Sequence, residues 1–398
     1  MKYKKPNLLL YRFAQFVSWI VAAVFFRRRI LRNEIRGKTG PFVVVANHEA
    51  ALDFVNLIGL TGRPMSFVIS NSFYNTLPVK AILRELGVIP KQQFQTSAAD
   101  LKRIKSVVNQ GEPLVIYPAG LMCEDGLSTP IPKASYKFLK WLGVDVYAAR
   151  TSGSYFVMPK WSRGLRAGRT DIDVYKLISA EELTGMTPEQ VQEKVDGALL
   201  FDAYREQETM RVRYAEADNI EGLENVLYMC PCCKKEFSMR VRDRRTIYCV
   251  ECGFEEESDE YAFLHKRRGR GRELRYVSDW SRMICADLKE RLRAGRDSVL
   301  TAKTKIHMID FEKNKFVEVG AGTVSLDERA FVLSGQIRGE GVELVTSIAD
   351  VPTLPFKPGR YFEIQHGKEI YRCVLEDGRL TMKFINMVKM FYELRCTA

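Results

Sequence analysis

Short apolar runs alternate with helical segments between residues 41 and 168, and this alternation constrains the fold of the 398-residue chain more than any other feature. The runs are rich in β-branched residues, as buried strands are. The segments between them carry apolar residues at helical spacing, and several end at glycine. Such alternation is typical of an α/β domain with a largely parallel central sheet. The predicted strands are residues 42–46, 66–69, 88–89, 114–117 and 144–149, and the predicted helices are residues 79–86, 97–110, 135–142 and 188–213.

A histidine and an aspartate follow the first predicted strand. The sequence from residue 46 to 53 reads ANHEAALD, which places His48 just beyond the strand and Asp53 at the start of a helix. Open α/β sheets bind ligands beyond the carboxyl ends of their strands. A carboxylate bonded to an imidazole fixes its tautomer and stabilises its protonated form. His48 is therefore a candidate general base for a hydroxyl nucleophile, and the alternative is an ordinary structural histidine.

The spacing Asn47-His48-x4-Asp53 resembles motif I of the glycerolipid acyltransferases, the family of the 1-acylglycerol-3-phosphate acyltransferases. LGVIP at residues 86–90 resembles the start of the family's second motif. YPAG at residues 117–120, with Asp125-Gly126 after it, resembles the third. The likeness spans roughly residues 1–215.

This resemblance implies an acyltransferase that moves a fatty acyl group from acyl-CoA or acyl carrier protein to a hydroxyl of a lysophospholipid or related lipid. His48 would be the general base and Asp53 its orienting acid, with backbone amides near Gly120 as candidate oxyanion donors. No organic cofactor beyond the acyl donor is implied. The candidate substrate-binding residues are Asn47, Lys91, Gln93, Pro118 and Gly120.

The second and third motifs depart from the family pattern at charged positions. Gln93 stands where the family has arginine, and Ala119, Leu121 and Met122 replace glutamate, threonine and arginine. Arginine pairs with phosphate through strong bidentate bonds that glutamine and methionine cannot make. We therefore expect the same transfer chemistry with a different or differently held acceptor. Lys91 is an available cation, and a catalytically degenerate member is the alternative.

The first 40 residues are strongly basic. They hold ten lysines and arginines against one acid, Glu34, whereas the whole chain has a net charge of +12. An apolar block at residues 7–26 precedes three arginines, and polar residues interrupt it. We expect a helix that lies in the interface of an anionic membrane, on its cytoplasmic face, in preference to a helix that spans the membrane once. A buried core helix is the alternative.

Two CxxC pairs predict a metal site. Cys230 and Cys233 form the first pair, and Cys249 and Cys252 form the second. Such spacing closes a four-thiolate cage around a structural zinc ion, which leaves no open position for catalysis. Cys232 lies inside the first pair and competes with Cys233 as a ligand.

The rest of the chain is expected to form smaller modules. A basic strip, KRRGRGRELR at residues 266–275, precedes a predicted helix, and short strands closed by a helix over 380–394 resemble a pleckstrin-homology-like or GRAM-like barrel. The expected domains are a membrane-associated segment (1–40), an acyltransferase domain (41–215), a zinc ribbon (226–262), a basic and helical linker (263–297) and a β-rich domain (298–398).

A second class of function remains open from the sequence. The ribbon and the basic strip suit a binding module for nucleic acid or protein, built on an inactive acyltransferase-like scaffold. Residues 201–297 carry 20 cations and 20 anions, however, and the acidic residues between 255 and 260 are expected to repel phosphate. Nucleic acid is therefore the less favoured partner.

Overall fold

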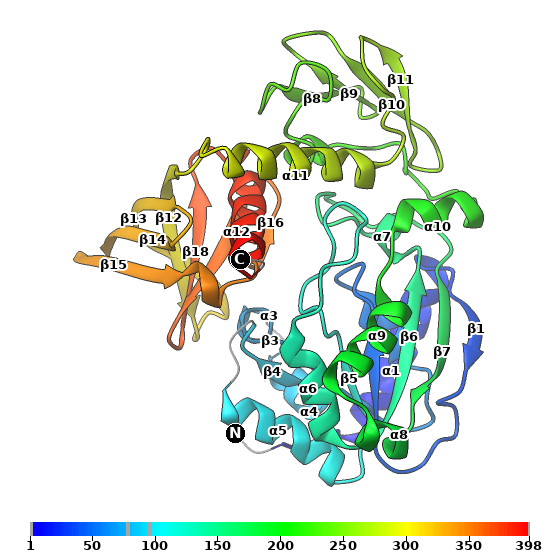
Figure 1. Cartoon of the computed structure of the whole chain (residues 1–398). Helices are drawn as coiled ribbons and strands as arrows, with labels where there is room; N and C mark the ends of the chain where they lie inside the picture. Colours follow the sequence, from blue (N-terminus) through cyan, green and yellow to red (C-terminus); the bar gives the residue numbers. More distant parts are fainter. Residues whose placement is uncertain (1–2, 77–79, 94–96, 397–398) are drawn as a thin grey trace. The chain divides into compact units, whose positions relative to one another are not determined.

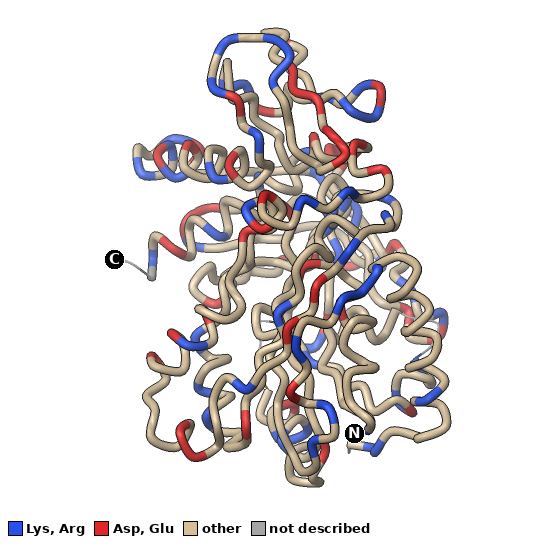
Figure 2. Tube along the Cα trace, turned by 90° about the vertical axis from the view of Figure 1, so that its right-hand side faces the viewer, with Lys and Arg blue, Asp and Glu red and all other residues tan. Residues whose placement is uncertain are grey.

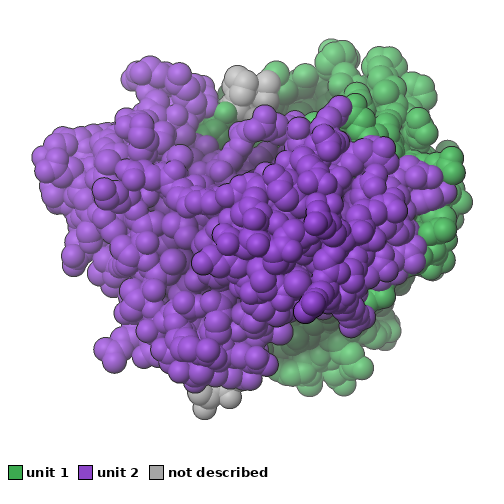
Figure 3. All heavy atoms as spheres, turned by 90° about the horizontal axis from the view of Figure 1, so that it is seen from above, with its two compact units in different colours: residues 1–160, 164–217 green, residues 161–163, 218–398 purple. Residues whose placement is uncertain are grey.

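The computed structural model describes residues 3–76, 80–93 and 97–396, and the chain divides into two compact units (Figure 3). Unit 1 comprises residues 1–160 and 164–217, and unit 2 comprises residues 161–163 and 218–398.

A seven-stranded sheet forms the centre of unit 1, in the order β1-β7-β6-β2-β5-β3-β4 (Figure 1). All its neighbouring strands are parallel except β6 and β7. The predicted parallel-rich α/β architecture is thus present. The strands are β1 (Arg29–Asn33), β2 (Phe42–Ala46), β3 (Ser66–Ser70), β4 (Ile89–Lys91), β5 (Leu114–Ile116), β6 (Asp145–Ser152) and β7 (Asp171–Ile178).

Helices cover both faces of this sheet. Alternate residues of the fully buried strand β2 enter two different cores, with Val43 and Val45 on one side and Val44 on the other. Helices α5, α6, α8 and α9 contribute to the first core, and α1 and α2 contribute to the second. The helices of unit 1 are α1 (Leu8–Val24), α2 (Asp53–Leu57), α3 (Asn71–Thr76), α4 (Lys80–Glu85), α5 (Ala98–Asn109), α6 (Lys133–Leu142), α7 (Ser154–Val157), α8 (Ala180–Gly185), α9 (Pro188–Leu199) and α10 (Ala203–Met210).

The long helix predicted over residues 188–213 is wrong, because two helices occupy this stretch. Helix α9 ends at Leu199, and Asp202 begins α10 by accepting hydrogen bonds from the amides of Tyr204 and Arg205. An N-cap aspartate satisfies helix-end amides in this way. Strands β1 and β7 are not predicted by the sequence pattern; they pair in parallel, and an ion pair at 2.5 Å joins their registered residues Arg29 and Asp171.

Helix α1 has two different sides. Tyr11, Ser18 and Ala22 are buried, and the Tyr11 hydroxyl donates to the carbonyl of Met65. The other side exposes large apolar residues: Leu8, Leu9, Phe13, Phe16, Val17, Trp19, Ile20 and Val24. None of the described helices has the length and hydropathy that crossing a bilayer requires.

Unit 2 begins with a four-stranded antiparallel ribbon in the order β11-β10-β9-β8 (Figure 1). Helix α11 (Val277–Arg293) packs on it through Trp280, whose indole donates to the carbonyl of Met229. The strands are β8 (Met239–Arg242), β9 (Thr246–Cys249), β10 (Glu255–Ser258) and β11 (Leu264–Arg268).

A second seven-stranded sheet, entirely antiparallel in its pairing, completes unit 2 and is followed by helix α12 (Leu380–Cys396). Strands β12 and β13 are longer than the short strands predicted, because they pair over eleven registered positions. The strand order is β15-β14-β13-β12-β18-β17-β16. The strands are β12 (Leu300–Asp310), β13 (Lys315–Leu326), β14 (Ala330–Ile337), β15 (Glu340–Ser347), β16 (Phe356–Lys357), β17 (Tyr361–His366) and β18 (Glu369–Leu375).

Candidate active site and metal centre

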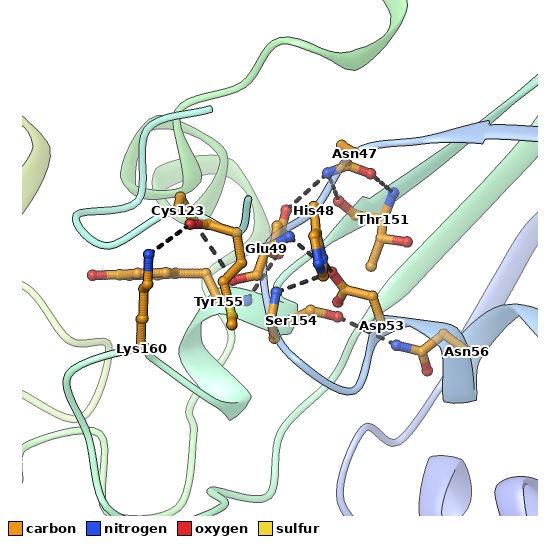
Figure 4. Close-up of polar contacts among 12 residues, drawn as sticks. Asn47, His48, Glu49, Asp53, Asn56, Cys123, Thr151, Ser154, Tyr155 and Lys160 are labelled. Carbon is orange, nitrogen blue, oxygen red and sulfur yellow. Dashed lines mark hydrogen bonds and ion pairs between the residues drawn. The ribbon is translucent and has the colours of Figure 1, made fainter. Parts of the chain in front are cut away.

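His48 and Asp53 meet just beyond strand β2 (Figure 4). The Nδ1 atom of His48 lies 2.9 Å from Oδ2 of Asp53, which also accepts the backbone amides of Glu49 at 2.8 Å and Ala50 at 2.9 Å. Asp53 is fully buried at the first position of α2, whereas the His48 side chain keeps 20% of its exposure. The carboxylate therefore fixes an Nδ1–H tautomer, which leaves Nε2 as the basic nitrogen.

Asn47 is held by strand β6 (Figure 4). Its Nδ2 donates to the carbonyl of Thr151 at 2.7 Å, and its Oδ1 accepts the amide of Thr151 at the same distance. The sequence predicts Asn47 as a substrate-binding residue. Because both ends of its side chain are bonded to the backbone of β6, it acts in this structure as the anchor of the His48 loop.

Glu49 points into the protein on the other side of this loop. One carboxyl oxygen accepts the Tyr155 amide at 2.9 Å, and the other lies 3.3 Å from Nδ2 of Asn47. Burial, reinforced by the charge of Asp53, raises the pKa of Glu49 to about 8. Glu49 thus ties the His48 loop to the start of α7. It was not among the predicted site residues, and only its place between His48 and Asp53 could have indicated it.

Tyr117 stacks on His48. It follows strand β5, and the two ring centroids are 4.4 Å apart with an interplanar angle of 28°. The Tyr117 hydroxyl is buried and has no hydrogen-bond partner among the described residues. Burial and the charge of Asp53 hold its pKa well above the usual value. The stacked ring restricts the rotation of the imidazole, a role that the sequence did not reveal.

The second and third motif segments lie against each other. Gln93 donates from Nε2 to the carbonyl of Gly120 at 2.6 Å, so the residue that replaces the motif II arginine contacts motif III directly. The Gly120 amide donates to the carbonyl of Tyr117 at 3.0 Å, so this amide is already engaged and is not a free oxyanion donor. The Pro118 carbonyl accepts the hydroxyl of Ser135 at 3.2 Å.

Lys91 ends strand β4 at the same edge of the sheet. Its Nζ donates to the carbonyl of Gln92 at 3.0 Å, and burial lowers its pKa. The third motif is also bound to the His48 loop itself. The Cys123 amide donates to the carbonyl of His48 at 3.3 Å, and its thiol lies 3.6 Å from the carbonyl of Glu49 (Figure 4). The structure thus brings all three motif segments to one edge of the sheet.

The four predicted metal ligands converge in unit 2. The Sγ atoms of Cys230, Cys233, Cys249 and Cys252 all lie within 4.8 Å of one another. Two of these pairs are 3.6 and 3.7 Å apart. Zn–S bonds of about 2.3 Å in a tetrahedron place sulfur atoms about 3.8 Å apart, so the donor set fits zinc. Cys232 is not a member of this cluster.

A histidine oriented by a buried aspartate beyond a central strand of an α/β sheet has the geometry that general-base activation of a hydroxyl group requires. Residues 8–156 match the model of a family described as Acyltransferase. This match supports the assignment of that segment to the acyltransferase family. The matched range does not include unit 2. A search of curated proteins found no matching relative.

Two solved structures align with parts of this chain. The 1-acyl-sn-glycerophosphate (LPA) acyltransferase PlsC from Thermotoga maritima aligns with 50% of this chain and 79% of its own, at 18% identity and a TM-score of 0.43. The Ran-binding domain of Nup2 from Ashbya gossypii aligns with 24% of this chain and 99% of its own, at 14% identity and a TM-score of 0.19. Both TM-scores lie below 0.5, so neither likeness carries a functional argument.

Proposed function

We propose that the protein is a membrane-associated acyltransferase that moves a fatty acyl group from acyl-CoA or acyl carrier protein to a hydroxyl of a lysophospholipid or related lipid. The observation that carries this proposal is the buried Asp53 carboxylate bonded to Nδ1 of His48 at 2.9 Å. The family match over residues 8–156 supports the reaction type.

The reaction needs one base and no covalent enzyme intermediate. Nε2 of His48 takes the proton of the acceptor hydroxyl as the oxygen attacks the thioester carbon of the donor. Asp53 stabilises the imidazolium that forms. The tetrahedral intermediate then expels the thiolate, which takes the proton from His48, so the products are an ester and a free thiol.

The acceptor site is expected to favour a masked phosphate. Gln93, Ala119 and Met122 offer no charge where the family offers two guanidinium groups and one carboxylate. Hydrogen bonds to charged groups contribute roughly 1.5–3 kcal/mol each, so losing two weakens phosphomonoester binding by about 3–6 kcal/mol. That is roughly a hundredfold or more in affinity. An acceptor with a phosphodiester or a sugar head group fits better, unless Lys91 compensates.

Helix α1 supplies the membrane contact in this proposal. Its apolar side, with Phe13 and Trp19 among the exposed residues, would lie in the interfacial region of the bilayer. Four of the cations in the first 40 residues, Lys4, Lys5, Arg29 and Arg32, are ion-paired within unit 1. Others, such as Arg12 and Arg36, would add attraction to anionic lipid on the cytoplasmic face. The exposed apolar side of α1 is opposite the side that packs on the rest of unit 1, so the helix can pack on the domain and contact the membrane.

One zinc ion is proposed for the cysteine cluster. Cys230, Cys233, Cys249 and Cys252 would hold it as thiolates, and its contribution would be structural because four protein ligands leave no open position.

Competition between acceptors tests the proposed function. Purified protein would receive one acyl donor with lysophosphatidic acid and other lysolipids at equal concentration, and mass spectrometry would identify the products. Acylation of lysolipids with masked phosphates, in preference to lysophosphatidic acid, is the expected result. The Lys91→Ala variant, compared with Lys80→Ala, measures the contribution of Lys91. A strong preference for lysophosphatidic acid that survives Lys91→Ala would contradict the acceptor assignment, and the absence of any acyl transfer would contradict the reaction.

A further inference from the structure

The ribbon carries a basic loop that the proposed reaction does not use. Residues 266–275 read KRRGRGRELR and continue from β11, the edge strand of the ribbon sheet. Figure 2 shows that the ribbon, at the top of that view, carries positions of both charges. The loop can bind an anion only through those basic side chains that are not already paired with acidic side chains.

The loop has a defined shape. Nζ of Lys266 donates to the carbonyl of Gly271 at 2.7 Å, and the Leu274 amide donates to Oε1 of Glu256 at 2.9 Å. Gly269 has φ +97°, and a Cβ there would lie 2.8 Å from the Cα of Phe254. The backbone is thus closed at its base and packed against the ribbon, which lowers the entropy cost of presenting its side chains.

The acidic residues of the neighbouring strand β10 are already compensated. Glu255 pairs with Arg242 at 3.0 Å, and Glu257 pairs with Arg267 at 2.8 Å. Glu256 is fully buried, and burial raises its pKa to about 8, so its carboxyl group is largely neutral at pH 7. The three glutamates of β10 therefore do not offset the rest of the loop. Glu273, which lies inside the loop, accepts the Lys266 amide at 3.2 Å.

Three arginines remain without a counter-charge. Arg268, Arg270 and Arg272 are exposed, and none of their side chains has an ion pair or hydrogen bond with any residue that the structure describes. They are separated by single glycines and so lie within one short stretch of backbone. Guanidinium groups bind phosphate oxygens in a bidentate manner, and they are less strongly hydrated than lysine ammonium groups.

We propose that Arg268, Arg270 and Arg272 form a docking surface for the phosphate groups of an anionic phospholipid membrane. Lipid fits better than nucleic acid because residues 266–275 include no aromatic side chain on which bases could stack. Clustered cations bind such membranes with about 1 kcal/mol each.

The test measures binding of the full chain to vesicles and does not depend on acyl transfer. Vesicles of phosphatidylcholine alone are compared with vesicles that contain phosphatidylglycerol, at low and at physiological salt. The variant Arg268→Gln/Arg270→Gln/Arg272→Gln removes the proposed surface. The control Lys303→Gln/Lys315→Gln/Lys368→Gln removes the same charge from exposed lysines elsewhere in unit 2. Unchanged thermal melting checks that both variants fold.

The arginine variant is expected to lose at least about tenfold in affinity for the anionic vesicles, and its binding to neutral vesicles, through α1, is expected to stay unchanged. The lysine control is expected to keep most of its affinity. Wild-type affinity of the arginine variant for anionic vesicles would overturn the proposal. A variant that loses affinity for a 20-nucleotide RNA while keeping its vesicle affinity would also overturn it, and would assign the surface to nucleic acid.

Discussion

Oδ2 of Asp53 accepts three hydrogen bonds at once, from Nδ1 of His48 and from the backbone amides of Glu49 and Ala50. The two amide bonds close the chain between the histidine and the aspartate into a rigid turn. The four residues between His48 and Asp53 are therefore enough to form this turn. The carboxylate fixes both the backbone of the loop and the tautomer of the His48 imidazole.

Replacing Asp53 with asparagine is expected to reduce kcat of acyl transfer by about 10²–10⁴-fold, because the amide cannot stabilise the imidazolium and favours the wrong tautomer. Asp259 offers a matched control, since its Oδ2 lies 2.8 Å from Nε2 of His265 in unit 2. Asp259→Asn should leave kcat within about twofold of wild type. Steady-state kinetics of the two variants make the comparison, and equal effects would contradict the role given to Asp53.

Tyr117 allows the stacking contact to be separated from the hydroxyl. Because the hydroxyl is buried without a partner among the described residues, Tyr117→Phe should leave kcat unchanged and stability equal or higher by about 1 kcal/mol. Tyr117→Leu keeps apolar bulk and removes the ring, so kcat is expected to fall roughly tenfold. Thermal melting and kinetics measure both. Full activity of the leucine variant would show that the ring does not position His48.

Glu49 predicts a pH dependence of stability. Its pKa in the folded protein is raised to about 8, so the folded state holds a proton that the unfolded chain loses near pH 4.5. The free energy of unfolding should therefore fall as pH rises from about 4.5 to about 8. The stabilisation that protonated Glu49 provides is fully present only below about pH 4.5. Glu49→Gln removes the titration and should flatten the slope. Melting temperatures at pH 5, 6.5 and 8 test this, and an unchanged slope would refute it.

The cysteine cluster predicts a metal-dependent unit 2. Glu236, between the knuckles, accepts bonds from Arg291 of α11 at 2.6 Å and from Lys383 of α12 at 2.7 Å. Cys249→Ser should therefore abolish bound zinc and lower the melting temperature of the C-terminal sheet as well as the ribbon. Cys232→Ser is the matched control and should keep one zinc per chain. Elemental analysis decides the point, and zinc loss in the Cys232 variant would mean a different ligand set.

Much of the site could be predicted because its signals are local in the sequence. A β-branched run followed by Asn-His and a helix start places His48 beyond a buried strand, and the Asp53 spacing then follows from one turn of chain. The four cysteines are equally local, because two CxxC pairs already bring ligands together in twos. The alternating pattern also gave the parallel-rich sheet, although it missed β1 and β7, whose polar residues depend on cross-strand ion pairs.

The contacts that were missed join residues far apart in the chain. Tyr117 lies 69 positions after His48 and meets it only because β2 and β5 are neighbours in the sheet. Asn47 was expected at the substrate, yet Thr151 of β6 holds it. The sequence predicts that acids offset Arg268 and its neighbours, whereas in the fold Glu255 pairs with Arg242 of β8 and Glu257 pairs with Arg267 of β11.

The most direct test of the account is the rate of acyl transfer to a lysolipid by the His48→Ala variant, measured beside His265→Ala as a control that removes another aspartate-paired imidazole. The account predicts a loss of at least about a hundredfold in kcat for His48→Ala, with a folded unit 1 by circular dichroism, and near wild-type activity for His265→Ala. Acyl transfer by His48→Ala at the wild-type rate would contradict it.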